Sequence, residues 1–503
     1  MKTQATLAAA ATLFSTFASA VEYISISGSN FINNSTGNRF DIIGVTYELN
    51  PSPSKYHIEL QYQPGGSAGF TNKADPLSDP SACLRDAILM QQLGVNTIRV
   101  YNLSPDLNHD ECASIFNAAG MYMIIDVNSG LSGQYIDRSD PSSTYTIDYM
   151  NHIFQVVEAF WSYPNLLGFF AGNEILNQDS SEDAPAYIRA VVRDLKEYIA
   201  LHAPREIGVG YSAADVSTML TDTWAYLGCT LENSTYSKMD FFGLNDYEWC
   251  GDSSYTESGY NSLTAEFADT DIPVFFSEYG CNNVAPRTFT NVPVLYGDQM
   301  TTLSGGLVYE YSEESDDYGL VSINSSTEVT LLQDYNFLKQ EFAKIDMSAL
   351  TAVNKTAESQ ATTACAASLI SESTFLADWD LPTRPSGGDD LVTSGITSAP
   401  SGAITSLTAT SMPATVYNYT GATVTGLSLV QLGCADTNQP GLAATYSASA
   451  ETCSYATSTG TSAKSSGGSG KKSGANPSAA IDFKAMAMVG SVLAAFIGGI
   501  AIL

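Results

Sequence analysis

Eight short runs of β-branched and aromatic residues recur along this chain, and patterns typical of amphipathic helices lie between most of them. Each run is apolar at almost every position, as expected of a strand that is covered on both faces. The expected strands are residues 40–45, 95–101, 122–127, 166–172, 207–211, 239–247, 273–279 and 306–311. The expected helices are residues 80–93, 110–119, 148–161, 184–202, 217–227 and 332–342.

Strand-helix alternation repeated eight times in one domain predicts a (β/α)8 TIM barrel, an α/β fold. An open doubly wound sheet is the alternative. That fold carries a G-x-G-x-x-G segment after its first strand, and none follows residues 40–45. We therefore expect a barrel whose active site lies at the C-terminal ends of the strands.

Composition divides the chain into five segments. A positive residue, an apolar run and the small residues Ala18-Ser19-Ala20 predict that residues 1–20 are a cleaved secretory signal peptide. Residues 21–350 form the expected catalytic barrel, and residues 351–385 form an extension that packs on it. The chain is then rich in Ser, Thr and Gly, which predicts a stalk over residues 386–474.

The C-terminal end has the features of a signal for a glycosylphosphatidylinositol (GPI) anchor. Small residues around Gly474 precede a short polar stretch and an uncharged tail, residues 485–503. Attachment at Gly474 makes residues 475–503 the removed propeptide. A terminal transmembrane helix is the alternative, but the glycines of this tail make it a poor permanent span. The expected location is outside the cell, on the outer face of the plasma membrane and in the cell wall.

Charge and cysteine content limit the classes of ligand. The chain has 21 Lys plus Arg against 53 Asp plus Glu, a net charge of −32 that disfavours nucleic acids but not a neutral polysaccharide. Its 8 cysteines are expected to form disulfides, and 4 histidines without a C-x-x-C pair argue against zinc. The acidic run at 313–317 lacks the spacing of a calcium loop and is interpreted as solvated. We expect no cofactor and no metal.

Two glutamates close apolar strands in this pattern. Glu174 follows the fourth run and Glu278 ends the seventh, where an unpaired carboxylate costs several kcal/mol to desolvate. Either could cap a helix or pair with an arginine such as Arg99 or Arg205. Together at one barrel mouth they favour glycoside hydrolysis, in which one carboxyl protonates the leaving oxygen and the other attacks. We predict a carboxyl separation of about 5–5.5 Å, the retaining geometry, with Asn173 near the sugar 2-hydroxyl.

Five segments, in order, resemble the fungal β-1,3-glucanosyltransferases of glycoside hydrolase family 72 over about residues 22–370. They are Tyr-Gln-Pro-Gly-Gly at 62–66, Gly-Asn-Glu at 172–174, Tyr-Glu-Trp-Cys-Gly at 247–251, Ser-Glu-Tyr-Gly at 277–280 and Gly-Gly-Leu-Val-Tyr-Glu-Tyr-Ser at 305–312. The resemblance implies that Glu174 is the acid/base and Glu278 the nucleophile. The positions that match the family's sugar-binding and supporting residues are Gln63, Tyr101, Asp126, Asn173, Tyr247, Tyr309 and Tyr318.

The resemblance also implies three disulfides, Cys83–Cys112, Cys229–Cys365 and Cys250–Cys281, whereas spacing alone leaves 105 connectivities open. Some family members carry a cysteine-rich carbohydrate-binding module after the barrel. Here only Cys434 and Cys453 follow Cys365, which is too few to build that module. These two cysteines are expected to close a small loop.

The sequence therefore predicts a GPI-anchored enzyme that cleaves an internal bond of a β-1,3-glucan donor and transfers the new reducing end to an acceptor glucan. An endo-β-1,3-glucanase is one alternative. A non-catalytic wall-anchored glucan-binding protein is another, and the presence of both glutamates argues against it. Stacking of acceptor sugars on aromatic rings favours transfer over hydrolysis. The candidate rings are Tyr47, Tyr62, Tyr135, Trp249, Tyr255, Tyr309 and Tyr318.

Overall fold

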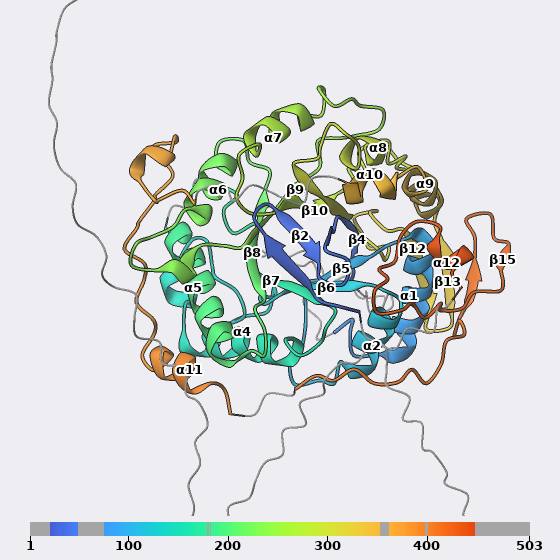
Figure 1. Cartoon of the computed structure of the whole chain (residues 1–503), viewed down its shortest axis with the longest axis horizontal. Coiled ribbons are helices and arrows are strands. Elements are labelled where there is room, and N and C mark those ends of the chain that lie inside the picture. The colour runs from blue at the N-terminus through green and yellow to red at the C-terminus, as the bar shows by residue number, and fades with distance from the viewer. Residues whose placement is uncertain are drawn as a thin grey trace, which may run out of the picture. The chain divides into compact units, whose positions relative to one another are not determined.

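Eight parallel strands close into a barrel in this computed structural model, which describes residues 21–48, 75–178, 181, 183–352, 362–397 and 401–447. The order around the barrel is the order along the chain, with the last strand paired to the first (Figure 1). The expected TIM barrel is confirmed. The strands are β4 (Ile42–Thr46), β5 (Thr97–Val100), β6 (Tyr122–Asp126), β7 (Leu166–Asn173), β8 (Gly208–Ala214), β9 (Phe241–Asp246), β10 (Val274–Tyr279) and β11 (Leu303–Val308).

Helices surround the barrel strands, as Figure 1 shows for α4 to α7. They are α1 (Pro80–Leu93), α2 (Asp110–Ala118), α3 (Pro141–Thr144), α4 (Ile147–Phe160), α5 (Ala184–His202), α6 (Leu220–Gly228), α7 (Tyr260–Glu266), α8 (Val292–Leu295), α9 (Gln333–Phe342), α10 (Met347–Ala352), α11 (Gly388–Ser394) and α12 (Leu442–Thr445), with short 3-10 helices η2 (Thr235–Ser237) and η3 (Ala367–Leu369).

Local signals set the helix ends that the sequence predicts correctly. Asp79 caps α1 by accepting the N–H groups of Ser81 and Ala82, and Gly94 ends the helix in the left-handed region at φ 93°. Strand β11 instead begins at Leu303, before the predicted start at 306. Glycine at the start of this strand makes it hard to predict from sequence. A Cβ on Gly305 would lie 2.2 Å from the Ile42 carbonyl oxygen, so this position excludes the β-branched residues that are typical of a strand.

A small antiparallel sheet closes the N-terminal end of the barrel. It contains β1 (Ile24–Ser27), β2 (Asn30–Asn33) and β3 (Asn38–Arg39). Phe31 of β2 is fully buried, and its ring lies 5.9 Å from Phe241 and 5.8 Å from Phe275, which lie near the starts of β9 and β10. Apolar rings therefore fill the barrel interior near the N-terminal ends of the strands. The polar side chains described below lie at the C-terminal ends.

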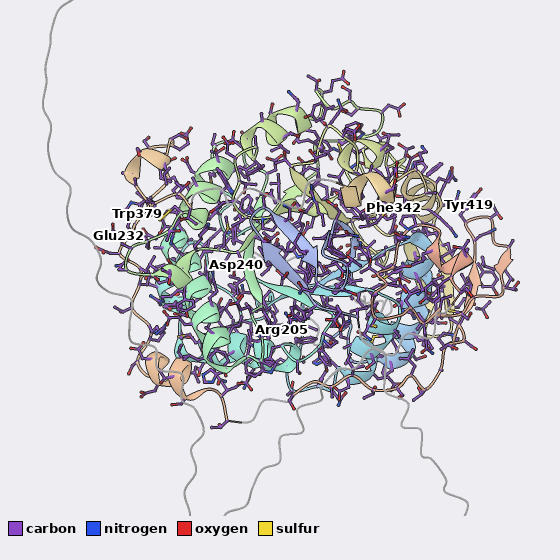
Figure 2. All side chains as sticks on the ribbon, viewed as in Figure 1. Arg205, Glu232, Asp240, Phe342, Trp379 and Tyr419 are labelled. Carbon is purple, nitrogen blue, oxygen red and sulfur yellow. A yellow bond between two sulfur atoms is a disulfide. The ribbon has the colours of Figure 1, made fainter. Side chains whose placement is uncertain are left out.

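Residues 401–447 pack on the barrel domain rather than extending from it, which differs from the stalk expected over 386–474. β14 (Thr415–Tyr417) joins a sheet with β12 (Val321–Ser325), β13 (Glu328–Leu331) and β15 (Thr423–Val424). Tyr419, between β14 and β15, marks this edge in Figure 2. Asn438 is fully buried and donates its side-chain amide to the carbonyls of Gln91 and Val95. Side-chain hydrogen bonds to α1 and the strand after it hold the segment, and a polar composition does not reveal such contacts.

Disulfides join neighbouring segments of the domain. Cys83–Cys112 links α1 to α2, Cys229–Cys365 links the end of α6 to the 362–397 segment, and Cys250–Cys281 links the loops after β9 and β10. These are the three pairs that the family resemblance implies. Cys434 is also disulfide-bonded, whereas Cys453 lies outside the described residues.

The segments expected at both ends of the chain lie outside the described residues, namely 1–20, 475–503 and the part of 386–474 that follows 447. In the part of the chain that the structure does describe, none of the helices combines the length and the apolar character that crossing a membrane requires.

Replacing Asn438 tests whether residues 401–447 belong to the folded domain. We expect Asn438→Ala to lower the free energy of unfolding by about 1–3 kcal/mol, because two carbonyl oxygens lose their buried donor. Equilibrium denaturation monitored by tryptophan fluorescence measures it. The half-buried neighbour Thr437 provides the control, since Thr437→Ala should change stability by less than about 0.5 kcal/mol. An unchanged midpoint for Asn438→Ala would mean that the segment contributes nothing to the fold.

Candidate active site

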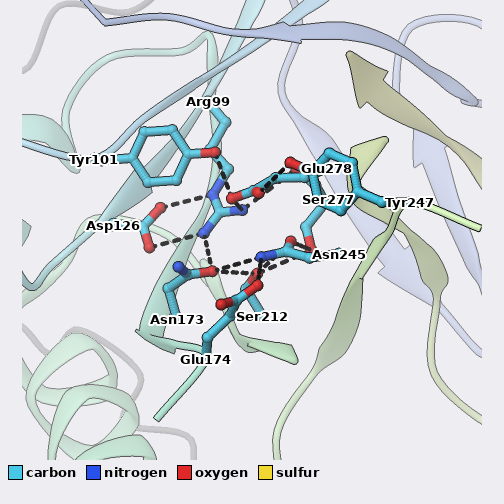
Figure 3. A network of polar contacts seen from close by, with 10 residues as sticks. All are labelled: Arg99, Tyr101, Asp126, Asn173, Glu174, Ser212, Asn245, Tyr247, Ser277 and Glu278. Atoms are coloured by element: carbon cyan, nitrogen blue, oxygen red, sulfur yellow. Dashed lines mark hydrogen bonds and ion pairs between the residues drawn. The ribbon is translucent and has the colours of Figure 1, made fainter. Parts of the chain in front are cut away.

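One buried arginine organises the C-terminal end of the barrel. Arg99 of β5 is 0% exposed, and its guanidinium donates to both carboxylate oxygens of Asp126, at 2.9 and 3.1 Å. It also donates to Asn173 Oδ1 at 3.0 Å and to Glu278 Oε1 at 3.3 Å (Figure 3). The side chains come from β5, β6, β7 and β10. A single guanidinium thus fixes the relative positions of polar groups on four strands.

The surroundings of the Arg99 guanidinium determine its charge state. Its guanidinium lies 4.3 Å from the centroid of the Tyr101 ring and 4.5 Å from that of Phe170, so it is shielded from water. Burial disfavours the charged form, but Asp126, Tyr101 and Glu278 together outweigh it and keep the pKa of Arg99 above its ordinary value. Burial raises the pKa of Asp126, and Arg99 opposes that rise. Asp126 therefore supports the site through Arg99, with both of its oxygens occupied.

Glu278 is enclosed by hydrogen-bond donors. It is 6% exposed, and the Tyr101 hydroxyl donates to Oε1 and the Tyr247 hydroxyl to Oε2, each at 2.8 Å. Burial raises the pKa of Glu278 to about 7, opposed by Arg99 and by the two tyrosines, while the Glu174 carboxylate adds to the rise. Donors on both oxygens favour the ionised form and fix the orientation of the carboxylate, as a nucleophile requires.

Glu174 is held differently. It is half-buried and its backbone lies in the left-handed region at φ 47°, an unusual conformation for a residue with a side chain. Its N–H donates to the Ser212 carbonyl at 2.9 Å, and its own carbonyl accepts from Arg138 at 2.8 Å. Its Oε1 accepts from Asn245 Nδ2 at 2.8 Å. The backbone thus positions Glu174 and leaves its carboxyl partly open to solvent.

The structure brings Glu174 and Glu278 into one polar network (Figure 3). Asn245 connects them, because it donates to Glu174 and accepts from Ser277 Oγ at 2.8 Å, next to Glu278 in the chain. The carboxyl separation of about 5–5.5 Å stays a prediction. Arg205, the other arginine considered as a partner, donates to the Leu166 carbonyl at the start of β7, the end of the strand opposite Glu174 (Figure 2).

Asn173 uses its side-chain oxygen within the protein. Oδ1 accepts from Arg99 at 3.0 Å, from Ser212 Oγ at 2.8 Å and from Asn245 Nδ2 at 3.1 Å. This fixes which way the amide is turned and presents its Nδ2 donor away from these three groups. A donor in that place suits a sugar hydroxyl.

Sequence reasoning missed Ser212, Asn245 and Ser277. Their side chains form one cluster, in which Ser212 Oγ lies 2.9 Å from Ser277 Oγ and 3.1 Å from Asn245 Oδ1. All three are 2% exposed or less. The available signal is a single polar residue near the end of an otherwise apolar strand, which needs a buried partner.

Three tyrosines form a wall beside Glu278. The rings of Tyr247, Tyr309 and Tyr318 meet edge to face, with centroids 5.3 to 6.4 Å apart. Of the other candidate platforms, Tyr47 is fully buried and its hydroxyl donates to Asp86, and Trp249 is 7% exposed and packs on Tyr260. Those two rings are part of the core. Gln63 and Tyr62 lie outside the described residues.

Comparisons with known proteins agree with this geometry. Residues 13–346 match the family model described as "Glucanosyltransferase" for glycoside hydrolase family 72. The chain is 53% identical to 1,3-beta-glucanosyltransferase gel2 of Aspergillus fumigatus over 85% of this chain and 86% of that protein. It is 45% identical to the probable 1,3-beta-glucanosyltransferase GAS3 of Saccharomyces cerevisiae, over 72% of this chain and 71% of that one.

Among solved structures, the chain resembles Saccharomyces cerevisiae Gas2p in complex with laminaritetraose and laminaripentaose. The TM-score is 0.61 at 37% identity, over 73% of this chain and 75% of that one. Fold, paired glutamates and the extent of the family match together show that the chain belongs to the glucanosyltransferases of glycoside hydrolase family 72.

Proposed function

We propose that this chain is a retaining 1,3-β-glucanosyltransferase that cleaves an internal bond of a β-1,3-glucan donor and elongates an acceptor glucan. The observation that carries the proposal is the contrast between two neighbouring glutamates. Glu278 has a donor on each oxygen, whereas Glu174 is half-buried and held by its backbone. The names of the relatives and the laminari-oligosaccharides bound to Gas2p support β-1,3-glucan as the substrate.

The reaction follows in two displacements. Glu174 protonates the glycosidic oxygen while a Glu278 carboxylate oxygen attacks C1, so the C1–O bond of the donor breaks and a glycosyl-Glu278 ester forms. The fragment with the old reducing end leaves. The non-reducing-end hydroxyl of an acceptor then loses its proton to Glu174 and attacks C1, which releases Glu278 as a carboxylate.

Transfer competes with hydrolysis at the second displacement. Stacking of acceptor sugars beside Tyr247, Tyr309 and Tyr318 holds the attacking hydroxyl at high effective concentration and displaces water. An endo-β-1,3-glucanase with the same pair of glutamates but without acceptor stacking on these rings would lack this advantage. The outcome of the competition therefore distinguishes the two activities.

We also propose that the chain is secreted and attached to the outer face of the plasma membrane through a GPI lipid at Gly474. The support is the order of segments in the sequence: an N-terminal apolar signal, small residues at 473–475 and an uncharged C-terminal tail. Phosphatidylinositol-specific phospholipase C should release the protein from spheroplasts. Retention in the membrane fraction after complete digestion of a known GPI protein would contradict the attachment.

Sizing the products from one substrate tests the proposed function. Incubation with a single reduced laminari-oligosaccharide should yield products both shorter and longer than the substrate, because the fragment is passed to a second chain. Mass spectrometry of the mixture measures this. Glu278→Gln should show neither class, and Glu266→Gln, which removes an exposed charge on α7, should behave as wild type. Shorter products alone would identify a glucanase.

The dependence of kcat/KM on pH should be bell-shaped with its fall at high pH near 7. Because the pKa of Glu278 is raised to about 7 with Glu174 charged nearby, the pair retains one proton below that pH. The proposed reaction needs one proton on the pair, with one carboxyl acting as the acid and the other ionised as the nucleophile. Above about pH 7 the pair loses this proton and no acid remains, and at low pH both carboxyls are protonated and no nucleophile remains.

Glu174→Gln provides the matched test of this assignment. With natural glucan its kcat/KM should fall by about 10²–10⁴-fold. With an aryl β-laminarioside, whose leaving group needs no acid, the first displacement should still release the aryl group in a burst, and later turnover should slow because Glu174 no longer acts as the base. The fall above pH 7 should then disappear, because no acid remains to be lost. A fall near pH 7 that is unchanged in this variant would assign that ionisation to another group.

A further inference from the structure

Three carboxylates gather on the β4–β11 side of the barrel mouth, outside the polar network of the two catalytic glutamates. Glu48 follows β4, and Glu310 and Glu314 follow β11. One oxygen from each lies within 4.8 Å of the other two. Glu310 is 0% exposed and Glu48 is 6% exposed, whereas Glu314 is half-buried. We call these three side chains the acidic triad.

Glu310 is buried, and its carboxylate lacks a hydrogen-bond donor among the described residues. Neither of its carboxylate oxygens accepts a hydrogen bond from a donor group of the described residues, and the same holds for Glu48 Oε1. Such oxygens normally find donors, since leaving a buried acceptor unpaired costs roughly 1–3 kcal/mol and more if it is charged. Glu310 therefore points to a ligand that the described residues do not supply.

Positive side chains of the described residues do not neutralise the acidic triad. The positive charge of Arg99 acts on Glu48 and lowers its pKa, but burial outweighs this effect. The guanidinium donates its hydrogen bonds to Asp126, Glu278 and Asn173 instead. Arg287 donates to the Tyr309 and Tyr318 carbonyls and pairs with Asp334 at 2.6 Å. Three neighbouring carboxylates repel one another when all are ionised. Either a bound cation must balance their charges or protons must neutralise some of them.

We propose that the acidic triad binds one Ca²⁺ ion. Carboxylates are hard oxygen ligands, which suit Ca²⁺ and Mg²⁺ rather than zinc or copper. Opposed oxygens around Ca²⁺ lie about 4.6–5.2 Å apart, a spread that three oxygens within 4.8 Å of one another can satisfy. Ligands from two separate segments also suit the variable coordination of Ca²⁺ better than the strict octahedron of Mg²⁺.

Thr46 supplies a further buried oxygen close to Glu48 in the sequence. Its hydroxyl is fully buried and accepts or donates no hydrogen bond within the described residues. Thr46 is the last residue of β4, and Glu48 follows it two positions later.

The site would tie the end of β4 to the loop that carries the tyrosine wall. That loop already contacts β4 through two hydrogen bonds, from Tyr311 N–H to the Thr46 carbonyl and from Ser312 Oγ to the Glu48 carbonyl. Tyr309 and Tyr318, which lie on either side of the acidic residues, face Tyr247. Bound Ca²⁺ would therefore stabilise the 309–320 loop as a unit.

A bound proton is the competing way to remove the charge. Burial, with Glu48 next to it, raises the pKa of Glu310 to about 12, and protonated Glu310 would donate to Asp316. A protonated Glu310 and a bound Ca²⁺ lead to different responses to added calcium. If protons alone neutralise the acidic triad, calcium should have no effect, whereas a Ca²⁺ site should show saturable binding.

Calorimetric titration of CaCl2 into the chelator-treated, full secreted protein tests the proposal. We expect saturation at one Ca²⁺ per chain, at least tenfold weaker binding of Mg²⁺, and a rise of several degrees in the midpoint of thermal unfolding with calcium. Glu310→Gln and Glu314→Gln should each weaken binding tenfold or more. Gln at 310 keeps the shape of a protonated glutamate, so this variant should fold.

The control is Asp317→Asn, which removes an exposed charge from the same loop and keeps a residue that tolerates the left-handed conformation found there, φ 62°. It should bind Ca²⁺ as wild type does. The proposal is overturned if wild type shows no saturable binding and no thermal shift. It is also overturned if Glu310→Gln and Glu314→Gln bind as wild type does, since the ion would then sit elsewhere on an acidic surface.

Discussion

The active site depends on a single positive charge placed inside a barrel whose lower half is filled with aromatic rings. Arg99 has no water to solvate it and rests on Phe170, so its charge is balanced only by the groups around it. Asp126 and Glu278 supply that balance, and Asn173 takes a further donor. Removing one partner of a buried ion pair leaves an uncompensated charge, typically at a cost of about 3–5 kcal/mol. The residues that bind Arg99 are therefore constrained by the fold as well as by the reaction.

That constraint produces two different glutamates. Glu278 shares Arg99 with Asp126 and receives two tyrosine hydroxyls, so its carboxylate is oriented and kept available as an anion. Glu174 contacts the network through a neutral amide and owes its position to a left-handed backbone held by Ser212 and Arg138. The proposed division between a nucleophile and an acid/base rests on these different surroundings.

Much of this arrangement could be predicted from sequence, because the barrel strands are apolar runs that end abruptly in polar residues. Glu174 and Glu278 were recognisable since a carboxylate at such a place needs a partner, and the resemblance to the family assigned their roles. The pairing of Glu278 with Arg99, weighed as an alternative to catalysis, is present in the structure and is compatible with the proposed catalytic role. Ser212, Asn245 and Ser277 were missed, because their importance lies in contacts between strands that a single strand does not reveal.

Other differences have similar causes. The start of β11 was hidden by glycines that the neighbouring strand requires, and the packing of residues 401–447 was hidden by a polar composition that resembles a stalk. The acidic triad was not recognised in the sequence, because only Glu314 belongs to the acidic run at 313–317 and Glu48 lies far away along the chain. Long-range pairing, rather than local propensity, decided each case.

The central claim is that Glu278 forms the covalent intermediate, and mass spectrometry of peptides tests it most directly. Glu174→Gln protein incubated with an aryl β-laminarioside should accumulate the glycosyl-enzyme, because the group that activates the acceptor is missing. The account predicts a glycosylated peptide that contains Glu278. A glycosylated peptide from elsewhere in the chain, or continued release of the aryl group with no glycosylated peptide after rapid acid quenching, would contradict it.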